Sequence, residues 1–325
     1  MEAIARLTGV SQVTVSRALN HPDKVSPQTL QRITDAIRAT GYVPNLVAGA
    51  LASRRSRLVA ALVPSMTNVV YAEMVQTFLS AVRVAGYQVL FGETGHSQAE
   101  EETFVRSVLS RRPDGVLLTG VHHTPACRHM LLGAKIPVVE LWDVTETPID
   151  ICVGFSHAGA GAAVADFVHS KGYRRAAVVT ADDARALSRE DQFCKSAVER
   201  GLSEPHVVVV EGASIGNGRR GLRRLLDEGF RDGVVVCSSD LLAHGILIEA
   251  ASRSIAVPQT LSVVGFGDQT FAADTHPALT SVHVDRSTLG LKAAEAMLGR
   301  LRGAPFDVAK IDVGFTIVQR ATTLP

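Results

Sequence analysis

The sequence predicts a small all-α head built around a helix-turn-helix, followed by an α/β body of two Rossmann-like lobes. Two observations predict this division. Three short helical segments with capping residues fill the first 43 residues. After residue 58, strand-length apolar runs alternate with amphipathic segments of helical length. The 325 residues, 46% hydrophobic and 20% charged, suffice for two or three domains with a large core.

Composition and charge narrow the class of protein. No apolar run reaches the roughly 18 residues of a membrane span, and the N-terminus lacks the basic-then-apolar pattern of a secretory signal. The four scattered cysteines are typical of reduced thiols, so we expect a cytoplasmic protein. Residues 1–57 contain eight basic and three acidic residues, whereas the remainder contains 25 basic and 29 acidic residues. A basic head on an acidic body indicates that the head meets a polyanion.

The first two helices are predicted from breaks, caps and apolar spacing. Residues 1–8 are predicted to be helical, with Ile4, Ala5 and Leu7 inward, and Gly9 ends this helix. Ser11 is predicted to cap a second helix, whose buried stripe comprises Val15, Ala18 and Leu19. The opposite face carries Gln12, Val13, Thr14, Ser16 and Arg17, a surface suited to a polar, anionic partner.

The third helix is predicted over "SPQTLQRITDAIRATG". Ser26 caps it, Pro27 takes its first position and Gly41 ends it. A small three-helix bundle that only packs on the body would share this pattern.

The full string "GVSQVTVSRALNHPDKVSPQTLQRITDAIRATGYVPNLVAGALAS" closely resembles the DNA-binding head of the lactose-repressor (LacI/GalR) family, almost continuously over residues 3–53. The resemblance implies a DNA-binding domain (1–43), a hinge helix with linker (44–57) and an effector-binding and dimerisation domain (58–325). It assigns base reading to Gln12, Val13 and Arg17, for adenine, a thymine methyl and guanine respectively. Phosphate-contacting positions are matched by Ser11, Thr14, Ser16, Asn20, Ser26, Thr29 and Asn45. In the hinge, Ala48 and Leu51 match the residues that enter the minor groove.

One departure from the family concerns the first helix. Related chains have a Thr or Ser cap and a short basic arm before it, whereas Met1 already lies inside the helix here. Either this head binds DNA weakly or the natural start lies upstream, and we favour an upstream start.

The body is predicted to contain parallel sheets covered on both faces. Its apolar runs are "LVAALV", "YQVLF", "GVLLTG", "IPVVEL", "AAVVT", "HVVVV", "GVVVCS" and "LSVVGF". Continuous apolar strands between helices favour that architecture, with a ligand at the carboxyl ends of the strands. The body resembles the family's sugar-binding core, which is shaped like periplasmic binding proteins. This implies lobes of about 58–155 plus 286–313 and 156–285 plus 314–325. The closing "FTIVQRATT" resembles the family's last strand, and the tetramerising helix of some members is absent, which implies a dimer on a pseudo-palindromic operator.

Family positions also assign an effector site. The matched residues are Ser65, Tyr71, Asp143, Arg185, Arg189, Asp240, Asp268 and Arg286. Gly267 stands where an aspartate often contacts sugar hydroxyls, while arginines replace other family residues at 185 and 286. Because an acid is lost and cations are gained, the effector is predicted to be a sugar acid. "PSMTNVVYAEM", "HTP", "IPVVELWD" and "ICVGF" resemble the family's gluconate-type repressors. A neutral sugar or a co-repressor are the alternatives within the family.

Other classes of function find weaker support. "GNGRRG" (Gly216, Gly218, Gly221) fits the dinucleotide fingerprint of a nicotinamide-dependent oxidoreductase, but "EGASI" separates it from the preceding strand. "HHTPACRHM" gathers His122, His123, Cys127 and His129, which we interpret as a surface loop and not a metal site. A transport binding protein would share the body but would not carry the head. We therefore expect a regulator without catalytic residues, cofactor, metal or membrane partner.

Overall fold

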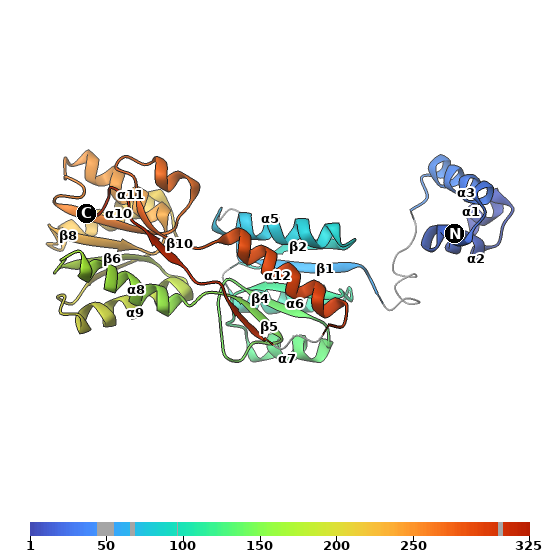
Figure 1. Cartoon of the computed structure of the whole chain (residues 1–325), viewed down its shortest axis with the longest axis horizontal. Coiled ribbons are helices and arrows are strands. Elements are labelled where there is room, and N and C mark those ends of the chain that lie inside the picture. Colours follow the sequence, from blue (N-terminus) through green and yellow to red (C-terminus); the bar gives the residue numbers. More distant parts are fainter. Residues whose placement is uncertain (44–54, 66–68, 96, 305–307) are drawn as a thin grey trace. The chain divides into compact units, whose positions relative to one another are not determined.

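The computed structural model describes residues 1–43, 55–65, 69–95, 97–304 and 308–325. The chain forms two compact units, Met1–Ser56 and Arg57–Pro325 (Figure 1). Within the described residues, none of the helices combines the length and the hydropathy needed to cross a membrane.

The first unit is a bundle of short helices. Its elements are α1 (Glu2–Thr8), α2 (Gln12–Asn20), the 3-10 turn η1 (Pro22–Lys24) and α3 (Pro27–Thr40). The predicted caps are present, since Ser11 Oγ accepts the Thr14 N–H at 3.1 Å and Ser26 Oγ accepts the Thr29 N–H at 3.4 Å. Gly9 and Gly41 end α1 and α3 in the left-handed conformation, with φ of 63°, which glycine adopts without strain. The core comprises Ile4, Ala5, Val15, Ala18 and Ile33.

Two side chains predicted to be inward face solvent instead. Leu7 is 65% exposed and Leu19 is 36% exposed. In α1 the buried stripe follows Ile4, Ala5 and Thr8, and at 3.6 residues per turn Leu7 lies well to one side of it. In α2 the stripe is centred between Val15 and Ala18, which places Leu19 at its edge in the last turn.

The first lobe of the second unit is built on a six-stranded sheet in the order β11-β5-β4-β3-β1-β2, with all neighbours parallel. Its strands are β1 (Leu58–Val63), β2 (Gln88–Glu93), β3 (Gly115–Thr119), β4 (Val138–Leu141), β5 (Ile151–Gly154) and β11 (Lys310–Asp312). Its helices are α5 (Val69–Val84), α6 (Gln98–Leu109), α7 (Pro125–Ala134) and α12 (Arg286–Leu301). The helix α12 lies beside α5 although more than 200 positions separate them in the sequence (Figure 1).

The second lobe repeats this plan in the order β12-β10-β9-β8-β6-β7, in which only the edge strand β12 is antiparallel. Its strands are β6 (Ala176–Ala181), β7 (His206–Val210), β8 (Gly233–Cys237), β9 (Leu261–Gly267), β10 (Thr280–His283) and β12 (Thr316–Val318). Its helices are α8 (His157–Ser170), α9 (Ala184–Glu199), α10 (Ile215–Asp227) and α11 (Asp240–Ser252), with the 3-10 segment η2 (Thr270–Asp274). The predicted pair of covered, largely parallel sheets is confirmed.

Alternation along the strands separates the cores. In β1, Val59, Ala61 and Val63 pack with α5 and α12, whereas Ala60 and Leu62 pack with α6 and α7. The first of these cores continues into the second lobe, where it includes residues of α8, α9 and their sheet. The other face of the second sheet packs under α10 and α11. One hydrophobic core therefore joins the lobes and supports the strand ends between them.

Candidate nucleic-acid interface and ligand cleft

The second helix of the head presents its polar face to solvent. Gln12, Val13 and Arg17 are exposed, and Val13 is 66% exposed although it is apolar. Val15 and Ala18, on the opposite face, hold the helix against the head's core. An exposed row of amide, methyl and guanidinium groups on one short helix can contact base edges in a major groove.

The predicted phosphate-contacting hydroxyls gather at two helix N-termini. Ser11 and Thr14 lie 3.0 Å apart at the start of α2, and Ser26 donates to Thr29 at 2.9 Å at the start of α3. Helix N-termini carry unpaired N–H groups and partial positive charge, which favour phosphate. Farther along α2, Asn20 Nδ2 donates to the Ser16 carbonyl at 2.9 Å. The predicted hinge residues Asn45, Ala48 and Leu51 lie outside the described residues.

A cleft of about 200 Å³ is lined by residues of both lobes in the second unit. It lies where strand ends meet, as expected for open α/β sheets. Its polar lining includes His122, Asp143, Thr145, Ser156, His157 and Arg185. Of the predicted effector residues, the structure brings four together here, since Asp143 and Arg185 line the cleft while Tyr71 and Arg189 contact its lining residues.

Arg185 extends from the first turn of α9 toward the other lobe. Its Nη2 donates to the Tyr71 hydroxyl at 3.0 Å, and its guanidinium lies 5.7 Å from the centre of the Tyr71 ring. Burial is the main cause that raises the pKa of Tyr71, so the phenol stays neutral and accepts this bond. Asp143, on the first lobe, is 8% exposed and accepts the Val144 N–H at 2.8 Å. Burial also raises the pKa of Asp143.

Arg189 lies one helical turn farther along α9. Its Nη1 meets His157 Nδ1 at 2.7 Å, its Nη2 donates to the Ser238 carbonyl at 2.9 Å, and its guanidinium lies 3.8 Å from the centre of the Phe266 ring. Burial lowers the pKa of Arg189 to about 10, and its Nε has no hydrogen-bond partner in the described part of the chain. Within the described parts of the chain, neither Arg185 nor Arg189 forms an ion pair with a carboxylate. Arg185 in the cleft lining and Arg189 beside it are therefore two cations that lack a paired carboxylate among the described residues.

His157 was not predicted as a site residue. Burial, followed by the Arg189 charge, holds its pKa well below the usual range, so the ring is neutral. Its Nδ1 accepts from Arg189 and its Nε2 donates to the Trp142 carbonyl at 3.0 Å. Trp142 has a φ of 81°, which is strained for a non-glycine residue, and its ring packs edge-on against Phe155. The only sequence signal for His157 is its place directly after a strand and a Ser cap.

Asp240 lies apart from the cleft lining and is fully buried. Its two carboxylate oxygens accept the Ser281 hydroxyl and the Gln269 N–H, both at 2.6 Å. Burial raises the pKa of Asp240 to about 6. These contacts brace the turn after β9.

Asp268 and Arg286 belong to the same brace. Asp268 pairs with Arg320 at 2.7 Å, and Arg286 Nε pairs with Glu73 of α5 at 2.9 Å. Arg286 also donates to backbone carbonyls at the end of β9, so it joins α5 to the second sheet. Ser65 is half-buried just after β1. Neither Ser65 nor these braced residues are among the cleft's lining residues.

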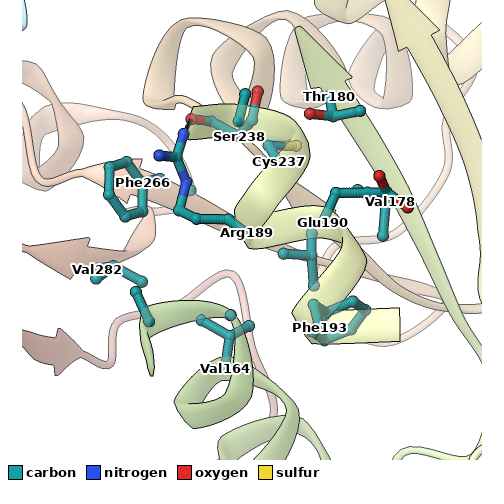
Figure 2. A pocket seen from close by; sticks show the side chains of 15 residues that line it. Val164, Val178, Thr180, Arg189, Glu190, Phe193, Cys237, Ser238, Phe266 and Val282 are labelled. Atoms are coloured by element: carbon teal, nitrogen blue, oxygen red, sulfur yellow. Dashed lines mark hydrogen bonds between the residues drawn. The ribbon is translucent and has the colours of Figure 1, made fainter. Parts of the chain in front are cut away.

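A smaller cavity lies inside the second lobe between α8, α9 and the sheet (Figure 2). Val164, Phe193 and Phe266 give it a mostly apolar wall, with Arg189 at one end. Its volume of about 30 Å³ compares with the roughly 10–15 Å³ that one water requires. The cavity has room for about two waters and none for a sugar.

The glycines of "GNGRRG" serve helix packing. A Cβ on Gly218 would lie 2.1 Å from the Leu242 carbonyl of α11, and one on Gly221 would lie 2.5 Å from Val179. All three glycines lie inside α10 instead of in a tight turn after a strand. The close approach of α10 to α11 at Gly218 and to β6 at Gly221 therefore explains two of them without a nucleotide.

The interpretation of "HHTPACRHM" as a surface loop is wrong for two of its residues. The helix α7 begins at Pro125, the side chain of His123 is 1% exposed, and Cys127 is buried. Cys127 packs in the hydrophobic core beneath α6 and α7, so this part of the segment is buried. His122 and His129 are exposed as expected.

Comparisons with known proteins agree with this geometry. Residues 1–45 match the family model described as bacterial regulatory proteins, lacI family, and residues 165–323 match a periplasmic binding protein-like domain. The chain is 35% identical to the HTH-type transcriptional regulator GntR of Pseudomonas aeruginosa, over 99% of this chain and 95% of the relative. A LacI-family transcriptional regulator from Silicibacter pomeroyi superposes with a TM-score of 0.91 at 32% identity, covering 98% and 97% of the two chains. The lac repressor dimer bound to operator shares the fold at 22% identity, with a TM-score of 0.84 over 99% and 98% of the chains.

Proposed function

This chain belongs to the LacI family of bacterial regulatory proteins, and from that premise we propose that it is a cytoplasmic, homodimeric repressor of sugar-acid catabolic genes that a sugar acid releases from its operator. As a member of this family it is a DNA-binding transcriptional regulator and not an enzyme. The proposal adds the residues that contact DNA, the chemistry of the effector and the direction of the response.

For the operator, the proposal rests on α2. Arg17 reads a guanine through two hydrogen bonds, Gln12 pairs with an adenine and Val13 contacts a thymine methyl. The hydroxyls at the starts of α2 and α3 hold phosphates and fix the register. Asn45, Ala48 and Leu51 contact the backbone and minor groove from the hinge, with Leu51 as the wedge. Two heads related by a two-fold axis then match two half-sites.

For the effector, one observation carries the proposal: Arg185 and Arg189 are half-buried cations, and neither has a paired carboxylate among the described residues. A ligand carboxylate would supply the missing anion. Arg185, which lines the cleft, takes that carboxylate, and the Asp143 oxygens accept ligand hydroxyls. A polyhydroxylated acid such as gluconate satisfies both ends of the cleft, whereas a neutral sugar leaves the arginines uncompensated.

The test measures operator affinity by fluorescence anisotropy at one salt concentration, because phosphate contacts make affinity salt-dependent. The DNA is the palindrome upstream of the gene, and a scrambled duplex is the control. Gluconate is compared with glucitol, which carries CH₂OH in place of the carboxylate. We expect tight binding that gluconate weakens and glucitol does not. Equal release by both ligands would refute the proposal that the effector is an acid. Tighter operator binding with gluconate would show that the acid is a co-repressor and not an inducer.

A further inference from the structure

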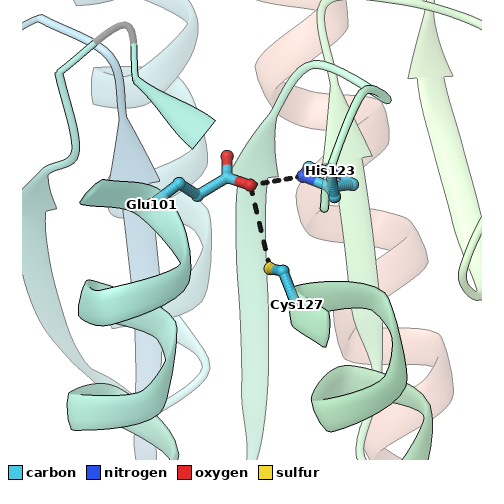
Figure 3. A group of neighbouring side chains, drawn as sticks. All are labelled: Glu101, His123 and Cys127. Carbon is cyan, nitrogen blue, oxygen red and sulfur yellow. Dashed lines mark hydrogen bonds and ion pairs between the residues drawn. The ribbon is translucent and has the colours of Figure 1, made fainter. Parts of the chain in front are cut away.

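Four chemically reactive side chains meet inside the first lobe, apart from the groups that line the cleft. They are Glu101 on α6, His123 in the loop after β3, Cys127 on α7 and Glu140 on β4. Figure 3 shows the first three pointing toward one another from three different elements. The side chain of His123 is 1% exposed, that of Glu140 is 0% exposed and that of Glu101 is 13% exposed.

The distances describe a set of possible metal ligands. His123 Nδ1 lies 2.6 Å from Glu101 Oε1, and Cys127 Sγ lies 3.8 Å from the same oxygen. One ligand atom from each of these three residues lies within 4.8 Å of the others. Nitrogen, thiolate and carboxylate ligands are those that zinc binds.

Glu140 supplies a second, independent observation. Its Oε1 lies 3.3 Å from His123 Nε2, yet neither atom has a hydrogen-bond partner of acceptable geometry among the residues that the structure describes. Its Oε2 is fixed by the Ile149 N–H at 2.6 Å. A fully buried carboxylate aimed at the far nitrogen of a candidate ligand histidine is the arrangement that orients metal-binding imidazoles in proteins.

We propose that this cluster is a zinc site, in which Glu101, His123 Nδ1 and Cys127 Sγ bind the ion and a water takes the fourth position. Glu140 is a positioning residue: in the metal-bound state its Oε1 accepts the Nε2–H of His123, and His123 Nδ1 exchanges its contact with Glu101 for the metal. Because zinc binds a thiolate and a neutral imidazole, the thiol proton and any proton on Nδ1 leave to solvent as the ion enters.

The site has a structural consequence for the cleft. His123 follows Val121 and His122, and both of these residues line the cleft. A metal bound to His123 would fix the loop that forms this wall. The proposed metal can be tested separately from the proposed sugar acid, because none of the three proposed ligands is a cleft-lining residue.

The test uses the reduced full-length protein, freed of metal with a chelator and titrated with Co²⁺ and then Zn²⁺. We expect a thiolate-to-cobalt charge-transfer band and the visible bands of four-coordinate Co²⁺, saturating at one ion per chain and lost when zinc replaces cobalt. Absence of the charge-transfer band in the wild-type protein would overturn the proposal.

Variants locate the site. Cys127→Ser should abolish the charge-transfer band, and a persisting band would place the thiolate elsewhere. Glu140→Gln should keep the band and lower zinc affinity about 10- to 100-fold, as loss of a positioning carboxylate does. His129→Gln, on the exposed side of α7, and Cys194→Ser, whose thiol lies 3.5 Å from Glu190 in the other lobe, are matched controls that should bind zinc like the wild type. Circular dichroism checks folding, and if Cys127→Ser does not fold, the affinity of Glu140→Gln decides: an unchanged value would refute the role of the cluster.

Discussion

Replacing Arg185 with Gln should separate acidic from neutral ligands. The change removes the charge and keeps a polar side chain of related length next to Tyr71, 3.0 Å away. Two unit charges 4 Å apart attract by about 4 kcal/mol at an effective dielectric constant of 20. Arg185 is only half-buried, so solvent screening reduces this, and about 1.5–3 kcal/mol, the usual value for a hydrogen bond to a charged group, is the better figure.

That energy corresponds to an affinity loss of about 10- to 150-fold for gluconate. A neutral analogue loses at most a neutral hydrogen bond, about 0.5–1.5 kcal/mol, or about 2- to 12-fold. Isothermal titration calorimetry with gluconate and glucitol measures both losses on the same protein. Arg174→Gln, an exposed arginine of the same lobe, is the control and should change neither affinity. Equal losses for the two ligands would refute the assignment of Arg185 to a carboxylate.

Three further outcomes are expected. Arg17→Ala should cost about 1–3 kcal/mol of preference for operator over scrambled DNA in anisotropy while weak nonspecific binding persists; retained discrimination would contradict base reading by Arg17. Because burial raises the pKa of Asp240 from 3.8 to about 6, the folded state favours the protonated form, and its stabilising contribution is lost as the pH rises through 6. Between pH 4 and pH 7 the wild type should therefore lose up to about 3 kcal/mol of stability relative to Asp240→Asn, which has no carboxyl group to titrate at this position. Urea unfolding of both proteins measures this difference, and a difference that does not change with pH would exclude the titration. Gly218→Ala should destabilise by about 1–3 kcal/mol through the clash with Leu242, whereas Gly216→Ala, with no atom nearer than 3.9 Å, should be neutral or stabilising; equal effects in urea unfolding would contradict the packing role.

Continuous apolar runs in the sequence predicted the buried central strands but not the strands at the edges of the sheets. The strand β1, buried along almost its whole length, is an unbroken apolar run, and β3 departs from one only at its terminal Thr119. The edge strand β11 has the sequence "KID", with two of its three residues exposed, so no apolar run marks it. The short β10, "TSVH", mixes polar and apolar residues although three of its four residues are buried, because Thr280 and Ser281 find hydrogen-bond partners inside. Only tertiary pairing reveals such strands.

Some site residues could likewise be predicted from the sequence, and others could not. Arg185 and Arg189, four positions apart on one helix, lie on a common face, and the sequence places both near the cleft. Asp240 also follows a strand end, but its carboxylate turns inward to Ser281. A sequence cannot show whether a polar group after a strand faces the cleft or satisfies a backbone N–H behind it. The sequence did not indicate His157 or Glu140 as site residues, because the residues that they contact are distant in sequence.

The contacts between the lobes indicate how an anion could act on distant DNA. Arg185 of α9 reaches Tyr71 of α5, and Arg286 joins Glu73 of the same helix to the end of β9. A ligand carboxylate that accepts hydrogen bonds from Arg185 competes with the Tyr71 hydroxyl, so ligand binding changes a contact between the lobes. The contacts of Arg286 and the shared hydrophobic core keep the lobes joined elsewhere. A ligand shifts a conformational equilibrium only through such differential contacts. If the effector weakens operator binding, as proposed, linkage requires that bound operator weakens the affinity for effector by the same free energy.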